Sequence, residues 1–196
     1  MSGGAGPVGR RHQRMPSGIT VRRLRTLEWR AFRDLRLAAL RSDPMAFGSS
    51  FARESAYTRQ KWQDWCRDGA IGNRNATFVA VSPSGKPVGM VGAFLVSGTA
   101  RVWGMWTRPG WRNRGAARSL MARLLAWLAA YSPDCPVVLD VNPSQAAATR
   151  IYAALGFRFT GVEEPLGHDP PAIVRQMVRL PVTHRTAGLR GVRRSP

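Results

Sequence analysis

One segment of the chain, Met105–Ala117, has residue types that suit the binding of a phosphate group. It begins as an apolar, strand-like stretch, turns at Pro109 and Gly110, and leads through basic residues into an amphipathic helix. The first amide groups of a helix have no acceptor within the helix, and together with the helix dipole they attract anions. Gly115 lets the backbone approach a ligand closely, and the arginines around it add fixed positive charge. The segment therefore predicts a diphosphate site.

A second segment, Val137–Phe157, combines the apolar residues of a buried strand with a turn and a short helix. Asn142 follows the strand directly, and Gly156 ends the helix. The two segments follow one another along the chain, so they predict two successive units of strand, loop and helix.

These two segments resemble the two signatures of the GNAT superfamily of N-acetyltransferases, and the resemblance covers about residues 19 to 181. The first resembles the acetyl-CoA pyrophosphate loop in the spacing Arg112-x-x-Gly115-x-Ala117. The second resembles a signature in which a strand is followed by Asn-x-x-Ala-x-x-x-Tyr and Leu-Gly-Phe.

The second signature is matched with one departure. Tyr152 and Leu155–Phe157 match, and Ala148 keeps the small residue. Gln145 stands where the family usually has Asn, while Asn142 lies just after the strand. The departure weakens one hydrogen bond and leaves the resemblance in place.

The resemblance implies that acetyl-CoA is the co-substrate. The basic loop and the start of its helix would hold the pyrophosphate, and the fourth strand would hold the thioester. The implied cofactor-binding residues are Met105, Trp106, Thr107, Arg112, Asn113, Arg114, Gly115, Ala116, Ala117, Arg118, Asn142 and Tyr152.

Acetyl transfer to an amine needs a polarised thioester carbonyl and a proton for the departing thiolate. Backbone N–H groups near Met105, Trp106 and Thr107 would polarise the carbonyl, as in the family. By its place in the motif, Tyr152 is the implied general acid, because a phenol with a pKa of about 10 can protonate the sulfur of CoA. Neither cysteine lies in a nucleophile motif, so we expect direct transfer in a ternary complex.

The general base is left open by the sequence. Many relatives carry a Glu on the fourth strand, but Ala100–Trp106 carries none, and Arg101 is its nearest charged residue. Either water relays the proton, or a carboxylate comes from elsewhere. The candidates are Glu54 on the second helix, and Glu163 or Glu164 after the sixth strand.

Glu163, Glu164 and Asp169 form the only acidic cluster in a basic chain. In the family this region borders the acceptor site, and we hypothesise that Glu163 and Glu164 hold a cationic amine. The acceptor amine belongs either to a small molecule, such as a polyamine, an amino acid or a drug, or to a protein lysine or N-terminus. Fold analogy does not choose between these classes.

The resemblance implies an α/β (α+β) fold with the element order βααβββαβαββ. Its mixed, mostly antiparallel sheet would be splayed between the fourth and fifth strands and flanked by helices. Thr26 is expected to cap the first helix. The expected strands are 19–24, 76–82, 87–97, 100–107, 137–141, 157–163 and 172–180, and the expected helices are 26–40, 50–67, 114–131 and 144–155.

A length of 196 residues with 44% hydrophobic content suits one domain, which we place at residues 19–181. Residues 1–18 and 182–196 are basic and have little to bury, so they are expected to be disordered tails. No apolar run reaches the roughly 20 residues of a membrane span, and the start lacks a signal peptide, so we expect a cytoplasmic protein with no membrane partner. The two cysteines have no metal-ligand spacing to His12, His168 or His184, so no metal site is expected.

The net charge of +19 keeps two other functions open. A basic surface attracts CoA, an acidic protein or nucleic acid, so a nucleic-acid- or ribosome-associated protein is one alternative, although no RNA-reading motif supports it. The other is a CoA-binding sensor or scaffold without catalysis, because the strand glutamate is missing. A homodimer also stays open, since no exposed apolar stripe identifies its interface.

Overall fold

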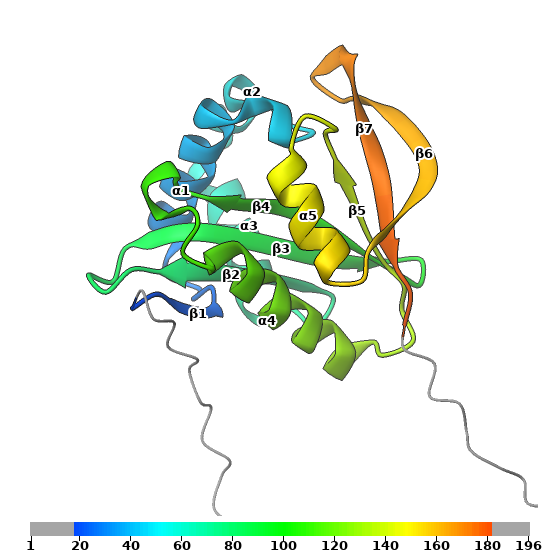
Figure 1. Cartoon of the computed structure of the whole chain (residues 1–196). Helices are drawn as coiled ribbons and strands as arrows, with labels where there is room; N and C mark the ends of the chain where they lie inside the picture. The colour runs from blue at the N-terminus through cyan, green and yellow to red at the C-terminus, as the bar shows by residue number, and fades with distance from the viewer. Residues whose placement is uncertain (1–17, 182–196) are drawn as a thin grey trace, which may run out of the picture.

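The computed structural model describes residues 18–181, and in these the chain forms one seven-stranded sheet with helices on both faces (Figure 1). The predicted tails at 1–18, apart from Gly18, and at 182–196 lie outside the described residues. Within residues 18–181, no helix is long and apolar enough to cross a membrane.

The strands run in the order β1-β2-β3-β4-β5-β7-β6, and neighbours are antiparallel except for the parallel pair β4 and β5. The strands are β1 (Thr20–Arg23), β2 (Asn75–Val81), β3 (Pro87–Val96), β4 (Thr99–Thr107), β5 (Val137–Val141), β6 (Arg158–Leu166) and β7 (Asp169–Arg179). The helices are α1 (Trp29–Ser42), α2 (Phe51–Ser55), α3 (Arg59–Ile71), α4 (Ala116–Tyr131) and α5 (Ala146–Ala154), with 3₁₀ turns η1 (Pro44–Ala46) and η2 (Pro109–Trp111).

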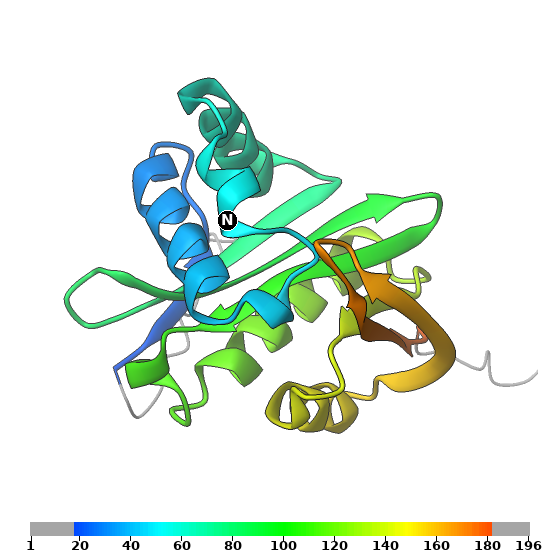
Figure 2. The same ribbon diagram turned by 90° about the horizontal axis from the view of Figure 1, so that it is seen from above.

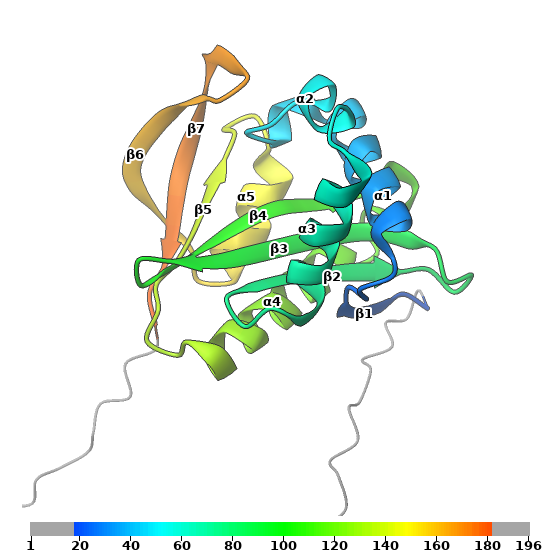
Figure 3. The same cartoon turned by 180° about the vertical axis from the view of Figure 1, so that it is seen from behind.

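Alternation along β2 separates the side chains into two cores. Ala76, Phe78 and Ala80 belong to the core beneath α4, whereas Val79 and Val81 belong to the core beneath α1 and α3. Figure 1 shows α4 and α5 on one face of the sheet, and Figure 3 shows α1 and α3 on the other. The sheet is therefore the middle layer of three.

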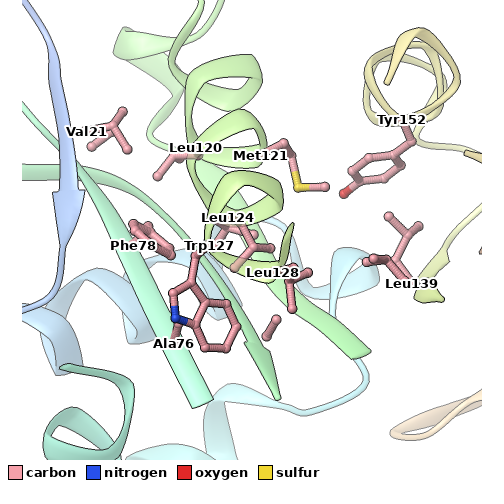
Figure 4. Close-up of a cluster of buried hydrophobic side chains, with 14 of the residues drawn as sticks. Val21, Ala76, Phe78, Leu120, Met121, Leu124, Trp127, Leu128, Leu139 and Tyr152 are labelled. Atoms are coloured by element: carbon pink, nitrogen blue, oxygen red, sulfur yellow. The ribbon is translucent and has the colours of Figure 1, made fainter. Parts of the chain in front are cut away.

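Helix α4 fixes the first of these cores with one apolar face. Leu120, Met121, Leu124 and Leu128 are at most 3% exposed and belong to the core between α4 and the sheet, and Figure 4 shows Met121 extending toward Tyr152. Burial of each such side chain contributes about 1.5–3 kcal/mol. This face holds the start of α4 at the end of β4, where the phosphate site is predicted.

The predicted splay between the fourth and fifth strands is confirmed. β4 and β5 pair only through Ala100 with Val137 and Arg101 with Val138, although β4 continues to Thr107. The strands then diverge.

β4 also carries a β-bulge in the part that has separated from β5. Its register with β3 shifts between Met90 and Gly92, so that Gly104 and Met105 lie opposite one β3 residue. Gly104 has a φ of +68°, a conformation that residues with a side chain rarely adopt. The bulge re-aims the backbone of β4 where it leaves β5.

The predicted second helix, residues 50–67, is wrong as a single helix. It is divided into α2 and α3, because Thr58 adopts an extended backbone and caps α3. Its hydroxyl accepts a hydrogen bond from the Lys61 N–H at 3.2 Å. An apolar pattern that continues through such a cap conceals the break.

The predicted cap of the first helix is also wrong. Glu28, and not Thr26, occupies the N-cap position of α1, and no side chain caps the helix there. The Glu28 carboxylate instead pairs with Arg22 on β1 at 2.6 Å. The Glu28 side chain thus forms an ion pair with β1 and does not cap the helix.

Candidate active site

A cleft of about 470 Å³ opens between the end of β4, the start of α4 and the start of α5. The segments that line it are far apart in the sequence, and α1 and η1 close one side. Its lining residues are Asp43, Ala46, Met105, Trp106, Thr107, Trp111, Arg112, Asn113, Gly115, Ala116, Ala117, Arg118, Ser144, Gln145, Ala147, Ala148 and Ile151.

The start of α4 offers backbone donors to this cleft. Gly115 is the N-cap residue with a φ of +78°, and no side chain caps the helix. The first helical hydrogen bond runs from the Ser119 N–H to the Gly115 carbonyl at 3.0 Å. The N–H groups of Ala116, Ala117 and Arg118 therefore have no acceptor within the helix. An anion fits this end of the helix.

Arg112 is held in place by two acceptors. Its Nε donates to the Thr107 carbonyl at 3.0 Å, and its Nη2 donates to Asp43 Oδ2 at 2.6 Å. Burial would raise the pKa of Asp43, but hydrogen bonds from Ser42, Trp106 and Arg112 lower the pKa overall. Asp43 is therefore a carboxylate that ties the loop before α4 to the end of α1.

Thr107 supplies a further polar group to the cleft. Its Oγ1 is buried and has no hydrogen-bond partner among the described residues, while the side chain lines the cleft. Buried polar atoms without partners are rare, and a ligand is one explanation. The donors of α4 and this hydroxyl fit a phosphate-bearing ligand such as acetyl-CoA.

A smaller cavity of about 40 Å³ continues the cleft into the space between the splayed strands. Ala46, Met105, Gln145 and Ala148 line both spaces. The other lining residues of this inner cavity are Val102, Trp103, Gly104, Leu139, Asp140, Val141, Asn142 and Tyr152. A ligand anchored at α4 can thus extend past α5 to the bulge of β4.

Tyr152 lies at the wall of the inner cavity. Its side chain is 6% exposed, and Figure 4 shows the ring pointing from α5 toward Met121, above Leu139 of β5. Burial raises the pKa of the Tyr152 phenol well above its ordinary value. The hydroxyl therefore stays protonated near neutral pH, as a proton donor must.

Asn142 stabilises the turn between β5 and α5, whereas the Gln145 side chain makes no capping hydrogen bond. Asn142 Oδ1 accepts hydrogen bonds from the Ser144 N–H at 3.0 Å and the Ser144 hydroxyl at 2.7 Å. Gln145 is the N-cap residue of α5, but its side chain caps nothing and lines both cavities. The residue that departs from the signature thus lies at the junction of the two spaces.

Asp140 is a site residue that the sequence analysis missed. It lines the inner cavity from β5 and forms an ion pair with Arg101 at 3.7 Å. Burial raises the pKa of Asp140; Arg101 lowers the pKa and Glu164 raises it further. The signal in the sequence is a lone carboxylate within the apolar strand Val137–Val141.

Glu54 does not reach either cavity. Both of its carboxylate oxygens accept hydrogen bonds from Arg36, at 2.9 and 2.7 Å, and the two side chains are at most 6% exposed. The Arg36 guanidinium also lies 4.7 Å from the Phe47 ring centroid. The structure thus places Glu54 in a buried ion pair and does not bring it to the other site residues.

The acidic cluster is divided by the structure. Glu163 pairs with Arg175 at 2.7 Å on the exposed surface and lines neither cavity. Glu164 lies within electrostatic reach of Asp140, and Asp169 begins β7. Only Glu164 is thereby connected to the inner cavity, and Glu163 is not brought to it.

The hairpin of β6 and β7 closes the acceptor side. A β-carbon at Gly167 would lie 3.0 Å from the Gly48 carbonyl oxygen, so the hairpin tip touches the loop after η1. Figure 2 shows this contact from above.

The cofactor residues implied by the sequence gather at these two spaces, with one exception. Arg114 lines neither cavity, and its guanidinium lies 5.0 Å from the Trp111 ring centroid. In the described part of the chain, no group of three His, Cys, Asp or Glu residues is arranged to hold a metal ion.

Comparison with known proteins gives one family match. The model described as the Acetyltransferase (GNAT) family matches residues 23–157. The comparison with curated proteins found no sequence match.

Several solved structures share the fold. A GNAT-family acetyltransferase from Streptococcus pneumoniae has 18% identity and a TM-score of 0.70, over 83% of this chain and 99% of that chain. A ribosomal-protein-S5-alanine acetyltransferase from Vibrio fischeri has 13% identity and a TM-score of 0.70, over 90% and 98%. A spermidine N-acetyltransferase from Vibrio cholerae, in complex with CoA and spermine, has 19% identity and a TM-score of 0.66, over 83% and 95%.

Proposed function

The chain belongs to the acetyltransferase (GNAT) family, and from this premise we propose that residues 19–181 transfer the acetyl group of acetyl-CoA directly to a primary amine. The observation that carries the proposal is the continuity of the site. The cleft at the start of α4 and the inner cavity between β4 and β5 share four lining residues. One passage thus joins a phosphate site to a pair of proton-transfer groups.

The cleft binds the pyrophosphate of the co-substrate. The N–H groups of Ala116, Ala117 and Arg118 donate to its oxygens, and Arg112 adds a charge that Asp43 and the Thr107 carbonyl hold in place. These contacts orient the thioester toward the inner cavity, which lowers the entropic part of the barrier.

Backbone donors at the bulge of β4 polarise the acetyl carbonyl. The bulge frees Met105 from regular pairing with β3, and β5 has diverged from β4 at this level. N–H groups that are already aimed at a developing oxyanion stabilise it without further reorganisation.

Asp140 and Tyr152 move the protons. Asp140 accepts a proton from the ammonium and releases it to solvent, and the free amine nitrogen then bonds to the carbonyl carbon. Asp140 accepts the second proton from this nitrogen as the bond from carbon to sulfur breaks, so that a neutral amide leaves. Tyr152 then donates its phenolic proton to the thiolate and regains a proton from solvent. The raised pKa of Asp140 brings this base closer to neutral pH, where a base works best.

The acceptor is a cationic amine, on a small molecule or on a protein. The side of the inner cavity that carries Asp140 also feels Glu164, so it attracts a positive charge. Two of the similar structures are a spermidine N-acetyltransferase and a ribosomal-protein-S5-alanine acetyltransferase, and spermidine and alanine both carry an amino group.

The experiment that tests the proposal is calorimetric titration with acetyl-CoA of the natural protein and a Gly115→Glu variant. The variant puts a carboxylate where the pyrophosphate binds. Gly98→Glu is the matched control, because Gly98 also has a positive φ, has open space around it and lies in the turn at the other end of β4.

Saturable binding by the natural protein and by Gly98→Glu, with a loss of at least about 100-fold in Gly115→Glu, supports the proposal. Acetylation of a panel of amines then identifies the acceptor. No binding of acetyl-CoA by the natural protein overturns the proposal.

A further inference from the structure

A second hollow lies on the molecule, between the first turn of α1 and the start of α3. It has a volume of about 460 Å³ and shares no lining residue with the cleft or the inner cavity. Its lining residues are Trp29, Arg30, Arg33, Asp34, Tyr57, Arg59 and Trp62. We infer that this hollow binds a small phosphate-bearing anion, at a site separate from that of acetyl-CoA.

The first argument is the charge that converges on one ring. The guanidinium of Arg30 lies 4.5 Å from the Trp29 ring centroid, and that of Arg59 lies 5.6 Å from the same centroid. Neither arginine has a carboxylate partner in the described part of the chain. Both guanidinium groups lie against one indole and add positive charge to the same hollow, and an anion bound there would offset their mutual repulsion.

The second argument is a buried donor without an acceptor. Trp62 is 1% exposed and lines the hollow, and its Nε1 has no hydrogen-bond partner within residues 18–181. A buried N–H without a partner costs free energy, and such groups are rare. Trp62 lines the hollow, so we take an anion bound there, after a small side-chain adjustment that uncovers Nε1, as the proposed acceptor.

The remaining groups favour an anion over a cation. Asp34 is the one acidic residue of the lining, and its exposed carboxylate lies 3.6 Å from Arg33. With that pair neutralised, Arg30 and Arg59 leave an excess of positive charge. Guanidinium groups form paired hydrogen bonds with phosphate oxygens, which gives the ligand class.

The hollow is connected to the catalytic region through stacked indoles. The Trp62 and Trp65 rings stack with centroids 5.4 Å apart, and Trp103 lies 5.1 Å from Trp65. Trp103 lines the inner cavity. The Trp62 indole lies in this aromatic cluster and lines the hollow, so its N–H signal can be used to detect a ligand there.

The test is titration with pyrophosphate in the Gly115→Glu protein, whose cleft cannot hold it. Calorimetry gives the affinity, and the indole N–H signal of Trp62 in a ¹⁵N NMR spectrum, assigned with Trp62→Phe, gives the location. A second protein adds Arg30→Ala and Arg59→Ala. The matched control adds Arg150→Ala and Arg158→Ala, two exposed arginines on α5 and β6.

We expect pyrophosphate to bind, to shift the Trp62 indole signal, and to bind at least about tenfold more weakly when Arg30 and Arg59 are removed. The control should bind like its parent. The inference is overturned if pyrophosphate does not bind the Gly115→Glu protein, if both double variants bind alike, or if a single-stranded oligonucleotide binds there and pyrophosphate does not. Because acetyl-CoA takes no part, failure of the proposed function would leave this result standing.

Discussion

The proposed active site has a cofactor side and an acceptor side, and the two are built in different ways. The cofactor side comes from one stretch of chain, residues 105–118, and presents backbone N–H groups fixed by a turn and a helix start. The acceptor side combines Ala46 from η1, Asp140 from β5 and the influence of Glu164 from β6. Here side chains, placed by long-range packing, supply the chemistry.

This difference teaches how each side should respond to change. A backbone donor cannot be deleted by shortening a side chain, so the cofactor side is sensitive to shape and charge at Gly115. A carboxylate can be neutralised with little change of shape, so the acceptor side is sensitive to single-atom substitutions. Substitutions on the cofactor side should therefore change the Kd for acetyl-CoA, and those on the acceptor side should change kcat or the acceptor KM.

The largest effect is expected for Asp140→Asn. Loss of the base should lower kcat about 10²- to 10⁴-fold and leave the Kd for acetyl-CoA unchanged, because Asp140 lines the inner cavity and not the cleft. Asp134→Asn, an exposed carboxylate in the loop before β5, is the control. A parallel loss of acetyl-CoA binding would break the separation of the two sides.

The pH profile sharpens the same prediction. Asp140 accepts a proton only when ionised, so kcat/KM should rise with pH through its pKa, which burial holds above the ordinary range of Asp. Arg101 lowers that pKa, so Arg101→Gln should move the rise to higher pH. An unmoved profile would show that another group is the base.

The next effect concerns the stability of the fold outside both cavities. Glu54→Gln removes one partner of a buried ion pair and leaves Arg36 uncompensated, so we expect a loss of about 3–5 kcal/mol in the free energy of unfolding. The same substitution at Glu163, whose pair with Arg175 is exposed, should cost about 0–1 kcal/mol. Urea denaturation measures both, and equal losses would contradict the burial argument.

Tyr152→Phe tests the proposed proton donor, which lies between the cofactor side and the acceptor side. Without the phenolic proton the thiolate is a poorer leaving group, and kcat should fall about 10²-fold at an unchanged melting temperature. Tyr131→Phe on the exposed end of α4 is the matched control. Steady-state kinetics would count against the role of Tyr152 if the two variants behaved alike.

A smaller effect is expected when the anchor of Arg112 is removed. Asp43→Ala frees the guanidinium, so the Kd for acetyl-CoA should rise about tenfold while kcat changes little. Asp68→Ala, at an exposed ion pair on α3, is the control. Calorimetry would reject the anchoring role if acetyl-CoA bound both variants equally.

The smallest effect separates two neighbouring glutamates. Glu164→Gln should raise the acceptor KM a few-fold, because Glu164 adds to the field at Asp140, whereas Glu163→Gln should leave the KM unchanged. Equal changes of the acceptor KM in the two variants would show that Glu163 and Glu164 act together on the acceptor.

The sequence predicts best the parts of the structure that depend on contiguous residues. The helix after the basic loop was predicted from the residues themselves, at 114–131, and the structure starts it at Ala116. The splay and the mixed sheet with one parallel pair were expected only because the two motifs resemble the GNAT family. The break at Thr58 was missed because the apolar pattern continues across it. Asp140 was missed because its significance depends on which strand lies beside β5, and no local pattern encodes that neighbour.

The splay also changes how the sheet is protected from aggregation. A seven-stranded sheet ordinarily has two free edges, and here β1 is short and basic while β6 carries charges and a proline, features that discourage another chain from pairing. The splay adds two inner edges, along β4 and β5, that must stay unpaired for catalysis. The space between them is narrow, and Arg101 and Asp140 form an ion pair across it. A change that widens the splay is therefore expected to expose a template for self-association.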